Sequence, residues 1–335
     1  MKKQLIAAAV AASMSAVAVA DVAITGNAKF EYDHTDNNGA TSNTSNTEVN
    51  LLIKGKSGDT SVVANLELNT HGDTATDHNS GKAGNQTAID VEDLYMTTKV
   101  GDINVKAGNW ASGTSALIGE IDNGSRSNNK IDLSTSFGDV KVYAGNNGRS
   151  QSEGDSNLNN NMYGGVTLNN VMGNTINFKK NSEVQDSFGI KGAVGGVSYR
   201  VESSDHDTEG DTTFVELAGS LGGIKVNVAS LNADTANALD EDDSSLFALS
   251  TGHSDNATAT GQDQVWISTN MEGTTVDLKM GSIEKGISTT KDRDYTQVKA
   301  TRKLASGATA VITFTDQDMS AGSKENLEIE LNVAF

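Results

Sequence analysis

The sequence predicts an all-β fold: a transmembrane antiparallel β-barrel of 16–18 strands with short periplasmic turns and long extracellular loops. Residues 327–335 alternate apolar with polar or small side chains, and the chain stops on the aromatic Phe335. Residues 1–20 have the pattern of an export signal, and paired alternating runs fill the rest of the chain. A strand of period two has one apolar and one polar face, which in an exported chain favours a barrel with lipid outside and water inside.

The leader has the three parts of a secretory signal peptide. It begins with two lysines, continues with an apolar run, and closes on Ala18 and Ala20, which form a small-x-small cleavage site. The apolar run is too short for a membrane anchor. We therefore expect residues 1–20 to be a signal peptide and residues 21–335 to be a single barrel domain.

Pairs of alternating runs predict the strands, because each pair is joined by a very short turn rich in Gly, Asp or Asn. Two further runs, 21–33 and 324–335, stand alone at the ends of the domain. The eight predicted hairpins are 46–57 with 59–70, 88–100 with 102–110, 128–137 with 139–146, 160–168 with 171–179, 185–194 with 197–203, 211–221 with 224–231, 262–271 with 274–284, and 293–304 with 308–317.

The remaining connections are polar and are predicted to be loops in water. An even number of antiparallel strands puts both ends of the domain on one side, so the short turns are assigned to the periplasm. The long loops are predicted at 34–45, 71–87, 111–127, 147–159, 204–210 and 232–261.

The two faces of the runs differ in charge. In run 21–33, Val22, Ile24 and Phe30 share one side, while Lys29 and Glu31 share the other. A charge facing lipid costs about 2–4 kcal/mol at mid-depth, so the charged side is expected to point into a lumen. Aromatic residues fall within or at the ends of the runs and are interpreted as an interfacial girdle: Phe30, Tyr32, Tyr95, Trp110, Phe137, Tyr143, Tyr199, Trp266 and Phe335.

Composition excludes several classes of function. The whole chain carries a formal charge of −19, and the leader holds two lysines and no acids, so the remainder carries −21. This acidic excess argues against a nucleic-acid partner. Cysteine is absent, which excludes a disulfide framework. A mean hydropathy of −0.39 does not separate a soluble chain from a barrel, because half of each strand is polar in both.

The chain resembles the general diffusion porins of Gram-negative bacteria. Segment 94–109, Leu-Tyr-Met-Thr-Thr-Lys-Val-Gly-Asp-Ile-Asn-Val-Lys-Ala-Gly-Asn, looks like the porin hairpin that leads into the third loop. Segment 51–55, Leu-Leu-Ile-Lys-Gly, is similar to the second strand of the family. Phe335 matches the C-terminal aromatic that the barrel-assembly machinery reads as an assembly signal. The resemblance implies an outer-membrane homotrimer of sixteen-stranded barrels, through which small hydrophilic solutes and ions diffuse passively.

The resemblance also implies a pore constriction. In the family the third loop folds into the lumen, and acidic residues on it face basic residues on the wall. The corresponding loop here is 111–127, and its charged residues are Glu120, Asp122 and Arg126.

Wall residues for this constriction follow from alternation. The basic candidates are Lys29, Lys54 and Lys106. The alternative for each is an ordinary lumen charge away from the narrowest ring, because strand register can slip by one residue. The family often has arginine where this chain has Asn109, so the basic side of the constriction is expected to be thin. With −21 overall, we expect a weak preference for cations.

No motif for catalysis or a resident cofactor is found. The five histidines lie in predicted loops without metal-ligand spacing. The acidic clusters 205–207, 240–243 and 316–318 are interpreted as solvated loops, with loop-bound calcium as the alternative. We therefore expect no enzymatic activity.

Three other readings compete with a channel. A secreted adhesin or β-solenoid would show short strands at a fixed period, whereas the hairpin spacing here drifts. A barrel enzyme would need an activated nucleophile or water that no spacing supports. A barrel that acts mainly as a surface receptor or structural anchor shares both faces with a channel, so the sequence leaves this alternative open.

Overall fold

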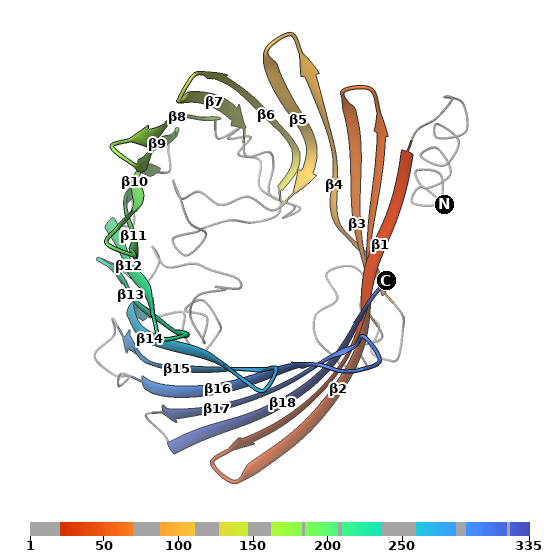
Figure 1. Cartoon of the computed structure of the whole chain (residues 1–335), viewed down its shortest axis with the longest axis vertical. Coiled ribbons are helices and arrows are strands. Elements are labelled where there is room, and N and C mark those ends of the chain that lie inside the picture. Colours follow the sequence, from red (N-terminus) through yellow and green to blue (C-terminus); the bar gives the residue numbers. More distant parts are fainter. Residues whose placement is uncertain are drawn as a thin grey trace.

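The chain forms one closed ring of antiparallel strands, as the computed structural model shows (Figure 1). The structure describes residues 21–69, 88–110, 127–146, 162–182, 185–206, 210–235, 259–285, 293–319 and 322–335. β1 pairs with both β2 and β18, and this second pairing closes the barrel. The eighteen strands fall within the predicted range of 16–18 and match the eight predicted hairpins with the two single runs, whereas the sixteen that the resemblance implies does not apply. The strands are β1 Asp21–Asn37, β2 Ala40–Ser57, β3 Thr60–Asn69, β4 Ala88–Val100, β5 Ile103–Trp110, β6 Ser127–Phe137, β7 Val140–Asn146, β8 Met162–Val171, β9 Asn174–Asn181, β10 Gln185–Val194, β11 Val197–His206, β12 Gly210–Leu221, β13 Ile224–Ala233, β14 Ala259–Met271, β15 Thr274–Lys285, β16 Arg293–Lys303, β17 Thr309–Met319 and β18 Gly322–Ala334.

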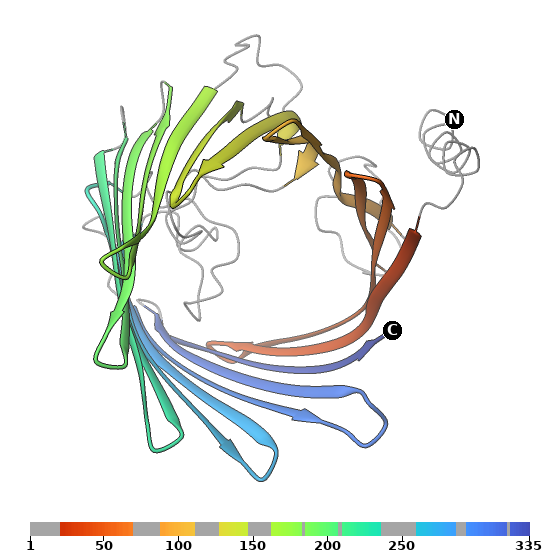
Figure 2. The same cartoon turned by 45° about the horizontal axis from the view of Figure 1, so that its top comes forward.

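Tight turns join the predicted hairpins at one rim of the barrel. Figure 2 shows these turns between neighbouring green and blue strands. Between β12 and β13, Gly222 and Gly223 have φ of 59° and 85°. Two successive positive φ values fit the two-residue hairpin turn that matches strand twist, and glycine adopts them without steric cost. We call this rim the short-turn end.

The prediction of a long loop at 34–45 is wrong, because most of these residues belong to β1 and β2. β1 and β2 stay paired up to Asn37 and Ala40, and the chain reverses at Asn38 and Gly39, with φ of 54° and 83°. An Asn-Gly pair favours such a turn, and β18 also pairs with β1 as far as Asn37. Polar strand residues were therefore mistaken for loop residues. The same correction applies to 204–210, because β11 runs to His206 and β12 begins at Gly210.

The turn between β8 and β9 lies further along the chain than predicted. The sequence placed it at Asn169 and Asn170, whereas the chain reverses at Met172 and Gly173. The register shifts between Leu168 and Val171, so the Asn pair sits in an irregularity of the ladder. Asn adopts positive φ more readily than most residues, and Asn170 does so here with φ of 58°. The Asn pair marks a bulge, and the reversal follows it.

Alternate side chains divide cleanly between the two faces. Ile24, Phe30, Ile312 and Phe314 stand exposed on the outer face, as do the other large exposed apolar side chains of the strands. The paired residues of opposite parity are mostly polar, charged or aromatic and line the inner face. The outer face therefore carries an apolar belt of the kind that a lipid-facing barrel needs.

The predicted aromatic girdle is only partly correct. Phe30, Phe137 and Phe335 do lie on the outer face, and Phe137 and Phe335 lie at strand ends, whereas Phe30 lies in the middle of β1. The ladder register instead puts four aromatics among the charged residues of the inner face: Tyr95, Trp110, Tyr143 and Trp266.

Burial is concentrated on the inner side of β12 to β17. Phe214 and Ile283 are fully buried, and Tyr295 is nearly so. Polar residues are buried beside them, and the hydroxyl of Tyr295 donates to Gln264 at 3.1 Å. Among the described residues, no helix has the length and apolar character required to cross a bilayer.

Candidate functional site

The inner wall of the barrel has an acidic sector where the ends of the sheet meet. β18, β1 and β2 place Glu328, Glu330, Glu31 and Glu48 on the inner face. The carboxylate oxygens of Glu31, Glu328 and Glu330 lie within 4.8 Å of one another. This sector presents negative charge to whatever occupies the interior.

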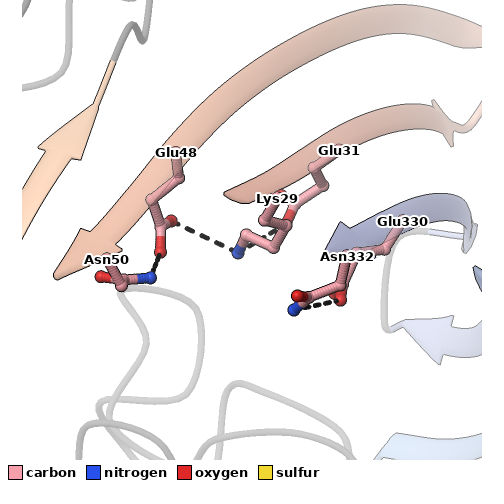
Figure 3. A network of polar contacts seen from close by, with 6 residues as sticks. All are labelled: Lys29, Glu31, Glu48, Asn50, Glu330 and Asn332. Carbon is pink, nitrogen blue, oxygen red and sulfur yellow. Dashed lines mark hydrogen bonds and ion pairs between the residues drawn. The ribbon is translucent and has the colours of Figure 1, made fainter. Parts of the chain in front are cut away.

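One lysine partly neutralises the acidic sector (Figure 3). The Nζ atom of Lys29 lies 3.0 Å from Glu31 Oε2 and 3.4 Å from Glu48 Oε2. Asn50 donates its side-chain amide to Glu48 and so fixes that carboxylate from the other side. Lys29 is thus held between two strands by two acids and is half-buried among them.

The strands on another part of the ring form a basic and aromatic sector. The Nζ atom of Lys106 lies 4.0 Å from the ring centroid of Tyr95 and 4.3 Å from that of Trp110. The two rings meet edge to face at 6.1 Å. Lys130 is buried, donates to the backbone oxygen of Trp110 at 2.7 Å and lies over the same ring at 5.5 Å. Aromatic faces attract cations, so the rings orient both ammonium groups.

Two tyrosines extend this sector across β7, β8 and β9. The hydroxyl of Tyr163 donates to Asp132 at 2.6 Å, and the hydroxyl of Tyr143 donates to Asn177 at 2.9 Å. Lys179 lies over the Tyr163 ring at 5.1 Å. The sector therefore combines ammonium groups, aromatic faces and hydrogen-bonding groups, which together suit polar solutes rather than lipid.

A third group lies on β11, β12 and β13. Arg200 forms an ion pair with Glu216, and Asn227 donates to the other oxygen of the same carboxylate. The Arg200 guanidinium also lies 5.6 Å from the Phe214 ring centroid. These charges satisfy one another along the wall.

The three predicted wall lysines all lie on the inner face but not together. Lys29 belongs to the acidic sector and Lys106 to the aromatic one. Lys54 shares a ladder row with Val63 and Tyr95. Asn109 pairs with Leu94 on the outer-facing row, so its replacement of a basic residue does not thin the inner wall at that point.

Several predicted site residues fall outside the described residues. They are the loop residues Glu120, Asp122 and Arg126 and the cleavage residues Ala18 and Ala20. Of the acidic clusters, 240–243 also lies outside them, while Asp316 and Asp318 belong to β17 rather than to a loop.

Sequence reasoning missed the clustering of the acids. The alternation of 327–335 does put Glu328 and Glu330 on one face. Their proximity to Glu31 depends on pairing between the first and last strands, which local pattern does not specify. The sequence did contain a signal for this proximity: the alternation of the last strand, together with the expected pairing of the first and last strands in a closed barrel.

Comparison with solved structures supports the fold. No protein-family model and no curated protein matches the chain. Solved structures do match: OccK2 (OpdF) of Pseudomonas aeruginosa, with 10% identity and a TM-score of 0.65, covers 94% of this chain and 98% of its own. OpdK of the same organism, solved with vanillate, has 11% identity, a TM-score of 0.65 and the same coverage. A variant of the Rh. blastica porin has 14% identity and a TM-score of 0.51, and covers 94% of this chain and 100% of its own. The barrel therefore has the fold of outer-membrane porins.

Proposed function

We propose that the chain is an outer-membrane porin that forms a water-filled channel for passive diffusion of small hydrophilic solutes and ions. The observation that carries the proposal is the division of the closed ring, with exposed apolar side chains outside and charged side chains inside. A charged inner wall is costly unless it is solvated or paired, whereas an apolar belt suits lipid. In this orientation the short-turn end faces the periplasm.

The similar structures support a channel for small polar solutes. They include a porin, OpdK solved with vanillate, and OccK2 solved with glucuronate. At identities of 9–14% these proteins suggest a class of cargo for this chain rather than a particular solute. The proposed role is transport without catalysis.

Ion preference is the finer part of the proposal. The total charge of −21 after the leader and the acidic sector favour a weak preference for cations. The lysines of the basic and aromatic sector oppose it, so we expect the preference to be small. A reversal potential measured across a salt gradient tests the sign, and an anion preference at low salt would contradict the prediction.

Single-channel recording tests the proposal itself. The domain 21–335, refolded in detergent and added to a planar bilayer, is expected to produce stepwise increases in current. A bilayer that contains folded protein but shows no steps would favour a surface receptor or structural anchor instead. Chemical cross-linking of the refolded protein tests the proposed homotrimer. Dependence of assembly on the barrel-assembly machinery is tested by depleting that machinery in cells.

A further inference from the structure

A pocket of about 460 Å³ opens on the inner wall at the short-turn end, between β2 and β6. Its size falls in the range of sites that bind small molecules. Apart from Val105, its lining residues have polar or charged side chains, among them Lys56, Lys99, Lys106, Asp59 and Asp132. Nothing in the proposed channel function requires a pocket here, so the charged residues that line it need a separate explanation.

Strand register brings Lys56, Lys106 and Asp132 into one ladder row. Lys56 pairs with Ser61, Ser61 with Thr97, and Thr97 with Lys106 across four neighbouring strands. Lys106 then pairs with Asp132. Because directly paired residues share a face, the whole row points inward. Lys99 lies two residues along β4 from Thr97 and points the same way.

The three lysines carry positive charge that no acid neutralises by direct contact. Among the described residues, no carboxylate lies within 4.0 Å of the ammonium group of Lys56, Lys99 or Lys106. Two lysines outside the pocket do contact acids: Lys29 contacts two glutamates, and Lys180 contacts Asp186 at 2.8 Å. The pocket therefore concentrates ammonium groups that remain available to a ligand.

Aromatic contacts fix one of these ammonium groups without cancelling its charge. Lys106 lies 4.0 Å from the ring centroid of Tyr95 and 4.3 Å from that of Trp110. A side chain already held in place loses less conformational freedom when it binds. The nearest acid on the row, Asp132, already accepts the hydroxyl of Tyr163. Lys106 is thus oriented and still able to donate.

We propose that this pocket is an oxyanion subsite of the channel, which binds the phosphate or carboxylate group of a small hydroxylated solute before the solute leaves at the short-turn end. The three ammonium groups bind the oxyanion. Ser61, Thr97 and Asn104 form hydrogen bonds with the hydroxyl groups of the solute. Asp59 and Asp132 disfavour a second anionic group in the same pocket. The inference builds on the proposed channel and adds a binding step to it.

Equilibrium binding tests the subsite independently of conduction. Inorganic phosphate and glucuronate are titrated separately into refolded, detergent-solubilised barrel, with binding measured by calorimetry. We expect at least one to bind and the variant Lys56→Gln/Lys99→Gln/Lys106→Gln to bind at least about tenfold more weakly. Lys225→Gln is the matched control, because Lys225 lies on the inward row near the short-turn end of β13 and does not line the pocket. This control is expected to bind as the wild type does.

Each result has a defined meaning. Tighter binding of phosphate or glucuronate by the wild type than by the triple variant supports the site. The anion that the wild type binds more tightly is the one that the site prefers. Equal affinity of the triple variant and the wild type would overturn the subsite, as would a failure of both phosphate and glucuronate to bind. In bilayers, anion added on the short-turn side is expected to reduce the wild-type current and not that of the triple variant. A bilayer without stepwise current would contradict the channel, while the calorimetric result would still decide the subsite.

Discussion

Gly26 and Phe335 exchange two backbone hydrogen bonds, each 2.9 Å long, between the first strand and the end of the last. The Phe335 ring also covers Gly26: a Cβ atom at that position would lie 2.9 Å from the ring's Cζ atom. The terminal aromatic, predicted as an assembly signal, thus lies at the closure of the barrel itself. Its fit depends on the absence of a side chain at Gly26.

Substitution Gly26→Val is expected to weaken closure. The new side chain must displace the Phe335 ring and meet the backbone of Asn50. Overpacking of this kind costs about 1–3 kcal/mol. Urea unfolding of the refolded barrel, monitored by gel mobility without heating, measures the loss of stability. Gly55→Val is the matched control, because nothing lies within 4 Å of a Cβ atom at Gly55. An equal loss in both variants would mean that strand glycines are generally sensitive.

Gly165→Ala is expected to disturb the inner wall, whereas Gly164→Ala is not. A Cβ atom at Gly165 would overlap the ring of Tyr143, which donates to Asn177 at 2.9 Å. At the neighbouring Gly164 the nearest atom is 3.6 Å away, an ordinary contact. We expect a loss of about 1–3 kcal/mol for the first variant only, measured by urea unfolding. Similar stability of both variants would show that Tyr143 moves aside freely.

Lys130→Met is expected to loosen the end of β5. Lys130 is 2% exposed and donates to the backbone oxygen of Trp110 at 2.7 Å. Removal of the Lys130 ammonium leaves this buried oxygen without its hydrogen-bond donor, which lowers the free energy of unfolding by about 1–3 kcal/mol. In a Trp266→Phe background, Trp110 is the remaining tryptophan, so its fluorescence reports the site directly. A red shift is expected from Lys130→Met, and an unchanged spectrum would contradict the contact. Lys225→Met, far along the ring, serves as the control.

Local sequence pattern was sufficient to predict the strands but not the grouping of side chains on the inner wall. Period-two alternation and Gly-containing turns predicted eighteen strands, because each signal acts within a few residues. The pattern failed at 34–45, where Thr, Ser and Asn form a strand stabilised by pairing on both sides of β1. Tyr95 and Trp110 were assigned to a girdle because they lie within or at the ends of runs, whereas the ladder puts them on the same inner-facing sides of β4 and β5 as Lys99 and Lys106. Such placements depend on cross-strand register, which a single sequence specifies only weakly.

Lys29 directly contacts two acids of the acidic sector. It lies 3.0 Å from Glu31 and 3.4 Å from Glu48, and Glu31 in turn lies within 4.8 Å of Glu328 and Glu330. These groups are partly exposed, so solvent limits the contribution of each ion pair to about 1 kcal/mol or less. The effect of the lysine on stability is therefore expected to be small, and its effect on the field inside the barrel larger.

Lys29→Met is accordingly expected to increase the preference of the channel for cations. Loss of one positive charge leaves Glu31 and Glu48 uncompensated beside two further carboxylates, and a group of carboxylates attracts cations. We expect the cation-to-anion permeability ratio to rise by about twofold at low salt and to fall back as salt screens the charges. Reversal potentials in potassium chloride gradients measure the ratio. Adding Glu48→Gln restores the local charge and should return the ratio toward the wild-type value. If the double variant stays as cation-preferring as Lys29→Met, the change arises from altered pore shape and not from charge.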